Sequence, residues 1–126
     1  MPALIMIADD DMDNRTIMAA ALTAAGFRVC LAENGAQALE SAAQQHPDLI
    51  LLDMSMPIMD GWTAVGRLKA DPALRAIPVW ALTAFALSGD EAKTKAAGCD
   101  AYLSKPCIPA ELVSRVRQAL NPGGTK

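Results

Sequence analysis

The amino-acid sequence lacks the features that mark several large classes of protein. The longest apolar run near the start of the 126-residue chain extends from Ala3 to Ala8, well short of the ~18 residues that a membrane-spanning helix needs. A secretory signal would need a basic segment before a longer apolar stretch, whereas this run follows Met1 and Pro2 and ends at aspartates. With a net charge of -3, the chain also lacks a basic surface for neutralising the phosphates of nucleic acid. We therefore expect a cytoplasmic protein with no membrane insertion and no direct DNA binding.

Cysteine and histidine are too scarce for a disulfide framework, a zinc site or a histidine-based catalytic centre. The three cysteines, Cys30, Cys99 and Cys107, are odd in number and widely spaced, and none forms a Cys-x-x-Cys pair. We interpret them as reduced thiols in packing or surface positions. The single histidine, His46, is expected in the last turn of a helix, where its partial positive charge suits the helix dipole.

The composition supports one folded core. Hydrophobic residues make up 52% of the chain and charged residues 20%, a balance that excludes intrinsic disorder. The length suits one domain, because single domains commonly have ~100 to 150 residues. We expect a domain over residues 1–121 and a flexible tail over residues 122–126. The start at Met1 and the polar end at Lys126 favour an independent protein over a fragment of a larger one.

Short apolar segments alternate with longer segments whose apolar residues recur at helical spacing. This alternation predicts an α/β fold, in which a doubly wound, five-stranded parallel sheet carries helices on both faces. Gly26 and Gly98 are expected to end helices. Ser88 and Pro109 are expected to begin them. The expected strands are Ala3–Ala8, Arg28–Ala32, Leu49–Asp53, Pro78–Leu82 and Ala101–Leu103.

Acidic residues gather where the first and third predicted strands end. Asp9, Asp10 and Asp11 follow the first strand, and Asp53 ends the third. Because the carboxyl ends of parallel strands meet at one edge of a sheet, these carboxylates should converge. Carboxylates at close range repel one another unless a cation offsets them, and Mg²⁺ suits such an oxygen-rich cluster. Alternatively, residues 9–13 only cap a helix, with Asp13 at its N-terminal end.

Two further strand ends carry polar side chains of a different kind. Thr83 follows the fourth predicted strand, and Lys105 follows the fifth. A carboxylate, a hydroxyl, an ammonium and an acidic cluster are the parts needed to move a phosphoryl group. Asp53 would be the nucleophile, Lys105 would pair with the phosphate and Thr83 would donate a hydrogen bond to it.

At this point the sequence resembles a known family, the CheY-like receiver domains of two-component response regulators. It is most similar to single-domain receivers of the DivK type, through the stretch from Thr83 to Tyr102. The resemblance implies the flavodoxin-like strand order 2-1-3-4-5 with five helices. The motifs that carry it are Asp9-Asp10, Leu51-Leu52-Asp53, Met56-Pro57-Ile58-Met59-Asp60-Gly61, Ala81-Leu82-Thr83-Ala84 and Tyr102-Leu103-Ser104-Lys105-Pro106.

The resemblance implies a function in phosphorelay signal transduction. Asp53 would accept a phosphoryl group from a sensor histidine kinase or a histidine phosphotransfer protein. Asp10, Asp53 and the main-chain carbonyl of Ser55 would bind Mg²⁺, and Asp9 would act through a metal-bound water. Such a protein catalyses only its own phosphorylation and dephosphorylation, so we do not expect an enzyme.

The resemblance also implies how the signal leaves the domain. Thr83 and Tyr102 would form the switch pair, in which the hydroxyl moves toward the phosphate and the aromatic ring turns inward. A downstream protein target would then read the surface of the fourth helix, fifth strand and fifth helix, and phosphorylation could make a dimer there.

Three alternatives stay open. A haloacid-dehalogenase-like phosphatase would use Asp9 as nucleophile in an Asp-x-Asp arrangement with Asp11, although Asp13 departs from that family's pattern. A degenerate receiver would no longer take phosphate. A receiver excised from a hybrid kinase or a larger regulator would share all these motifs.

Overall fold

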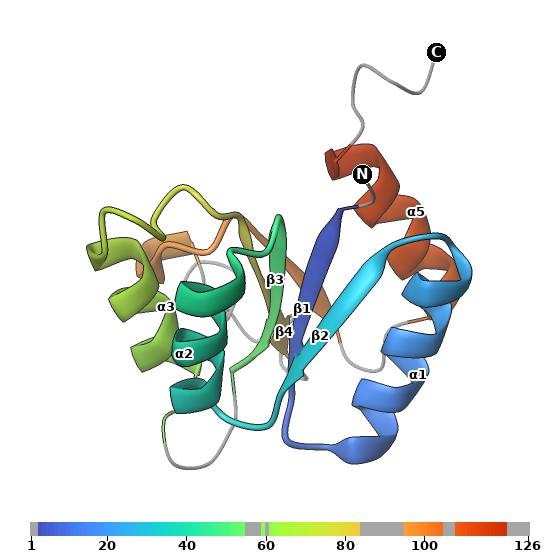
Figure 1. Cartoon of the computed structure of the whole chain (residues 1–126), viewed down its shortest axis with the longest axis horizontal. Helices are drawn as coiled ribbons and strands as arrows, with labels where there is room; N and C mark the ends of the chain where they lie inside the picture. Colours follow the sequence, from blue (N-terminus) through green and yellow to red (C-terminus); the bar gives the residue numbers. More distant parts are fainter. Residues whose placement is uncertain (1–2, 55–58, 60, 84–94, 105–107, 121–126) are drawn as a thin grey trace.

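The computed structural model describes residues 3–54, 59, 61–83, 95–104 and 108–120 (Figure 1). Each of the five predicted strands is present, with ends within one residue of those expected. Ser88, where the sequence predicts the start of a helix, lies outside the described residues, and residues 95–97 are helical. The strands are β1 (Leu4–Ala8), β2 (Arg28–Ala32), β3 (Leu49–Asp53), β4 (Val79–Thr83) and β5 (Ala101–Ser104). The helices with assigned bounds are α1 (Met12–Ala24), α2 (Gly35–Gln45), α3 (Gly61–Ala70) and α5 (Pro109–Leu120).

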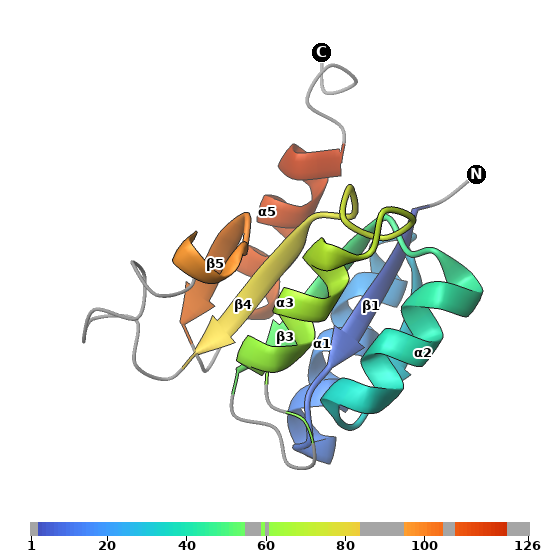
Figure 2. The ribbon, with the colours of Figure 1, turned by 90° about the vertical axis from the view of Figure 1, so that its left-hand side faces the viewer.

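The five strands form one parallel sheet in the order β2-β1-β3-β4-β5. Helices α2 and α3 cover one face of the sheet, and α1 and α5 cover the other (Figure 1). This is the doubly wound fold that the sequence predicts. Because the strand order reverses beside β1, a site is expected outside the carboxyl ends of β1 and β3. The arrows of β1 and β4 point to one edge of the sheet, and α1 begins there (Figure 2).

The central strands β1, β3 and β4 are buried along their whole length. Successive side chains of a strand point to opposite faces, so each strand contributes to two separate cores. The core under α2 and α3 includes Met6, Ala8, Ile50, Leu52, Val79 and Ala81. The core under α1 and α5 includes Ile5, Ile7, Leu49, Leu51, Trp80 and Leu82. A sheet filled in this way holds the strand ends in fixed positions.

The ends of the helices follow local hydrogen-bonding chemistry. The N-cap of α1 is Asp11, because its side chain accepts hydrogen bonds from the main-chain N–H groups of Asp13 and Asn14. The helix-cap alternative placed Asp13 at this position instead. His46 lies at the C-cap of α2 with φ of 46°. Gly26, predicted to end a helix, has φ of 98° just after α1, a conformation that glycine adopts without a steric penalty.

Helix α3 starts unusually close to the end of β3. The main-chain N–H of Gly61 donates to the carbonyl oxygen of Met54 (3.3 Å). A Cβ at Gly61 would lie 2.5 Å from the Met54 Cα and 2.6 Å from the Asp53 carbonyl oxygen. Only glycine fits at this position, and the contact fixes the residue that ends β3.

No helix within the described residues is both long enough and apolar enough to cross a membrane.

Candidate functional site

The register of the sheet brings two aspartates together. Ala8 of β1 is paired with Leu52 of β3, so the next residues along the two strands, Asp9 and Asp53, lie side by side. Strand β4 ends at the same edge with residues 82 and 83, because its Leu82 is paired with Asp53. The carboxylates that the sequence places after two strands therefore converge in the folded chain.

An acidic cluster results at this edge. One carboxylate oxygen from each of Asp9, Asp10 and Asp53 lies within 4.8 Å of the others. Asp9 is completely buried and Asp53 is 2% exposed, whereas Asp10 faces solvent. The burial of Asp9 contradicts the alternative in which this acidic segment only caps a helix. Three hard oxygen donors at this spacing, with one side open to water, match the requirements of Mg²⁺, which takes few protein ligands and keeps several waters.

Residues of the first turn of α1 hold Asp9 in place. The side-chain amide of Asn14 donates to Asp9 Oδ2 (3.2 Å), and the main-chain N–H of Asp11 donates to Asp9 Oδ1 (2.9 Å). The guanidinium of Arg15 donates to the Asp9 main-chain carbonyl (2.6 Å). Asn14 and Arg15 were not among the residues predicted from the sequence. The signal that could have found them is their place one helical turn after the strand-ending aspartates.

The predicted switch residues lie on the two neighbouring strands. Thr83 ends β4 and is 4% exposed, next to the residue paired with Asp53. Tyr102 of β5 is paired with Ala81 and is half-buried, and its main-chain carbonyl accepts from Arg115 Nη1 (3.2 Å). The two other predicted site residues, Ser55 and Lys105, lie outside the described residues.

A second polar contact, also missed from the sequence, anchors the start of β5. Asp100 Oδ2 accepts from the main-chain N–H of Val79 (2.8 Å) and from Lys69 Nζ (3.1 Å). Lys69 Nζ also donates to the carbonyl oxygens of Arg75 and Ile77 (3.2 and 3.0 Å). These hydrogen bonds join the end of α3 and the loop after it to the start of β5, the strand that carries Tyr102.

The thiols of the described residues are packing groups, as expected. Cys30 and Cys99 are free. Burial raises the pKa of the Cys99 thiol to about 11, with a further increase from Asp100 that Lys69 opposes. Burial also raises the pKa of the Cys30 thiol, against the effect of Arg28. A thiol with a raised pKa is a poor nucleophile at neutral pH, and Cys107 lies outside the described residues.

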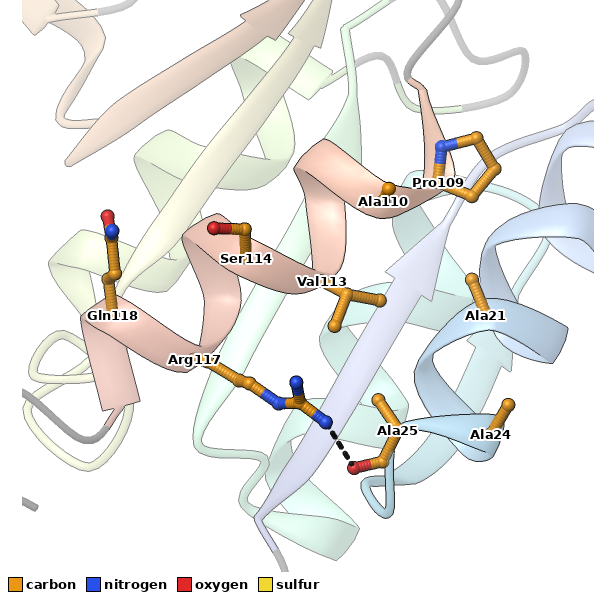
Figure 3. A pocket seen from close by; sticks show the side chains of 9 residues that line it. All are labelled: Ala21, Ala24, Ala25, Pro109, Ala110, Val113, Ser114, Arg117 and Gln118. Atoms are coloured by element: carbon orange, nitrogen blue, oxygen red, sulfur yellow. Dashed lines mark hydrogen bonds between the residues drawn. The ribbon is translucent and has the colours of Figure 1, made fainter. Parts of the chain in front are cut away.

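An open groove of about 570 Å³ lies between α1 and α5 (Figure 3). Arg117 reaches across one end of it and donates to the main-chain carbonyl of Ala25 (3.3 Å), which satisfies an acceptor at the end of α1. None of the described residues that line the groove carries a carboxylate, thiol or imidazole, so these residues offer no group for phosphoryl chemistry. Its lining residues are Ala21, Ala24, Ala25, Pro109, Ala110, Val113, Ser114, Arg117 and Gln118.

Comparison with known protein families distinguishes the receiver domain from the other functions that this geometry could serve. The model of the response regulator receiver domain matches residues 5–117, which is most of the chain. The chain belongs to the response regulator receiver family. This confirms the resemblance drawn from the sequence motifs, and it disfavours the alternative of a haloacid-dehalogenase-like phosphatase.

Three response regulators and receiver domains show which members of the family this chain is similar to. The polar-differentiation response regulator DivK of Brucella anthropi is 38% identical over 120 residues, which cover 95% of this chain and 98% of DivK. The chemotaxis response regulator CheY4 of Vibrio cholerae has a TM-score of 0.88 at 27% identity and covers 94% of this chain and 98% of its own. The receiver domain of the sensor histidine kinase PA1611 from Pseudomonas aeruginosa has a TM-score of 0.85 at 39% identity, with 94% and 97% covered, and was solved with magnesium coordinated in its active site cleft. The receiver thus resembles both DivK and the receiver of a sensor kinase.

Proposed function

We propose that this receiver is a single-domain response regulator that takes a phosphoryl group onto Asp53 in a Mg²⁺-dependent reaction. The donor is a sensor histidine kinase or a histidine phosphotransfer protein, and a downstream protein target receives the signal. The domain comprises residues 1–121, and residues 122–126 form a tail. The protein catalyses only its own phosphorylation and dephosphorylation.

The observation that carries this proposal is the convergence of Asp9, Asp10 and Asp53, two of them buried, at the carboxyl edge of the sheet. Carboxylates packed this closely are stabilised by a divalent cation. Asp53 is the buried member that belongs to its strand, where it is paired with Leu82 of β4, whereas Asp9 lies one residue beyond the end of β1. A nucleophile needs such a fixed position, because the attacking oxygen must align with the bond that breaks.

In the proposed step, a carboxylate oxygen of Asp53 attacks the phosphorus of a phosphohistidine. A P–O bond forms while the P–N bond breaks, and the imidazole keeps the electron pair of that bond and takes up a proton. Asp10, Asp53 and the main-chain carbonyl of Ser55 would hold Mg²⁺, with Asp9 acting through an intervening water. When bound, the ion would neutralise the negative charge on the phosphoryl oxygens.

Three further residues complete the proposed mechanism. Lys105 would pair with the phosphoryl group as a point charge, and Thr83 would donate its hydroxyl to it. The move of Thr83 would leave space into which the ring of Tyr102 turns. New phosphate contacts would then shift the population between two packings of the surface formed by the fourth helix, β5 and α5.

The test of the proposal uses the purified protein with acetyl phosphate and Mg²⁺. Borohydride reduction of the acyl phosphate and mass spectrometry of the digested protein then identify the labelled residue. We expect the label on Asp53, and we expect EDTA to abolish it. A label on Asp9, or labelling that is unaffected by EDTA, would contradict the proposed reaction.

Exposed apolar side chains at the starts of α1 and α5 suit the docking of a protein donor. Met12 begins α1 and is 67% exposed, and Ile108 precedes α5 and is 60% exposed. These two helices are neighbours on one face of the sheet (Figure 1). Exposed apolar groups next to a site often mark a surface that binds another protein.

Replacing both Met12 and Ile108 by serine is expected to slow phosphotransfer from the cognate kinase about tenfold, because truncating the few side chains that dominate a protein interface costs more than ~1 kcal/mol of binding each. Phosphorylation by acetyl phosphate should not change, since that donor needs no docking surface. Transfer from purified, radiolabelled kinases measures the effect. The control is Leu31→Ser, which removes a side chain of similar exposure (48%) on the edge strand β2. Equal slowing with both donors would contradict a docking role.

A further inference from the structure

The Asp9 carboxylate is buried, yet each of its oxygens accepts a hydrogen bond, one from the N-cap residue of α1 and one from the first turn of that helix. Asp9 Oδ1 accepts from the main-chain N–H of Asp11 (2.9 Å). Asp9 Oδ2 accepts from the side-chain amide of Asn14 (3.2 Å). With both oxygens engaged, the carboxylate is held in one orientation relative to Asp10 and Asp53. The bond from Asp11 is made by the main chain and persists in any variant, whereas the bond from Asn14 can be removed by substitution.

The N-cap of α1 determines where Asn14 lies. Asp11 Oδ1 accepts from the main-chain N–H of Asp13 (2.9 Å) and from that of Asn14 (3.4 Å). These bonds fix the first turn of the helix. The guanidinium of Arg15, one residue further, donates to the Asp9 carbonyl and also ties this turn to the end of β1. Asn14 is therefore held against the end of β1 independently of its own bond to Asp9.

The amide of Asn14 donates a hydrogen bond without adding charge. A lysine or arginine at this position would place a cation beside Asp9 and compete with a divalent ion for the cluster. An aspartate would add a fourth carboxylate and could not donate. Asparagine therefore orients the buried carboxylate and leaves the full negative charge of the cluster available for a metal.

We propose that Asn14 is a positioning residue that sets the affinity and the ion selectivity of the acidic cluster, an inference that rests on the magnesium site of the proposed function. Mg²⁺ demands a near-ideal octahedral arrangement of ligands, whereas Ca²⁺ accepts irregular and flexible ones. Loss of the Asn14 bond lets the Asp9 carboxylate rotate. It therefore weakens the binding of Mg²⁺ more than that of Ca²⁺.

The size of the expected loss of metal affinity can be estimated from other metalloproteins. In these, removal of a residue that orients a metal ligand typically lowers metal affinity about 10- to 100-fold. Because Asp9 acts through water and keeps its bond from Asp11, we expect Asn14→Leu to raise the Kd for Mg²⁺ about tenfold. The Kd for Ca²⁺ should rise less than about threefold, because its coordination is more tolerant. Asn14→Ala, which introduces no apolar bulk, should give the same ratio.

Isothermal titration of the full chain with MgCl₂ and with CaCl₂ tests the inference without reference to phosphorylation. Thr16→Val is the control, because it removes an exposed polar group of the same helix and should leave both Kd values unchanged. A Mg²⁺ Kd within twofold of wild type in both Asn14 variants would overturn the inference, as would equal losses for the two ions. Wild-type protein that binds no Mg²⁺ would overturn the proposed function together with it, whereas normal wild-type binding with unaltered variants would overturn the role of Asn14 alone.

Discussion

Gly61→Ala is expected to lower the free energy of unfolding by about 3 kcal/mol, at the upper end of what overpacking a filled site costs. The added methyl group would lie 2.5 Å from the Met54 Cα and 2.6 Å from the Asp53 carbonyl oxygen. Both atoms belong to the main chain, so no side chain can rotate away, and either β3 or α3 must shift. Equilibrium unfolding in urea, followed by circular dichroism, measures the loss.

The same helix provides the control. Gly66 also lies in α3, is exposed, and has no atom within 4 Å of an added Cβ. Gly66→Ala should raise the free energy of unfolding by about 0.5 to 1 kcal/mol, because alanine favours the helix and loses less conformational entropy on folding. The two identical substitutions therefore have opposite expected signs. A loss in Gly61→Ala no larger than about 1 kcal/mol would mean that the approach of α3 to β3 is readily relaxed.

The sheet could be predicted from the sequence because its central strands are buried on both faces. Segments such as Leu49–Asp53 are short and almost wholly apolar, and few other structures suit such a pattern. The ends of the strands were predicted less accurately. The expected strand included Pro78, but the assigned strand begins at Val79. Pro78 has no N–H to donate to the ladder, although its carbonyl still accepts from the N–H of Ile50 (3.0 Å).

The convergence of Asp9 and Asp53 was also predictable, because parallel strands end at one edge of the sheet. The surroundings of Asp9 were not. They depend on which aspartate caps α1, and the cap is two residues earlier than the alternative with Asp13 assumed. Each helical residue turns by ~100°, so an error of two residues rotates the expected face of the helix by about 200°. The contact between Asn14 and Asp9 therefore became visible only in the folded chain.

Asp53→Asn is expected to abolish phosphoryl transfer from acetyl phosphate and from a phosphorylated kinase. The amide has nearly the same shape as the carboxylate but is not a nucleophile toward phosphorus. The fold should persist. Two unit charges within 4.8 Å of each other repel by at least about 3 kcal/mol at an effective dielectric constant of ~20. Removing one charge from this cluster should leave the free energy of unfolding in EDTA equal to that of wild type or higher.

Asp10→Asn is the matched comparison, because it removes the same charge from the exposed member of the cluster. It keeps the proposed nucleophile and loses a proposed metal ligand. Its phosphorylation should be slower and should require more Mg²⁺, whereas Asp53→Asn should incorporate nothing at any Mg²⁺ concentration. Both variants should lose stabilisation by Mg²⁺, since an ion stabilises the fold only as far as it binds the native state. Label incorporation into Asp53→Asn at the wild-type rate would identify another residue as the phosphoacceptor. Loss of labelling that accompanies unfolding would instead show that this carboxylate holds the end of β3 in place.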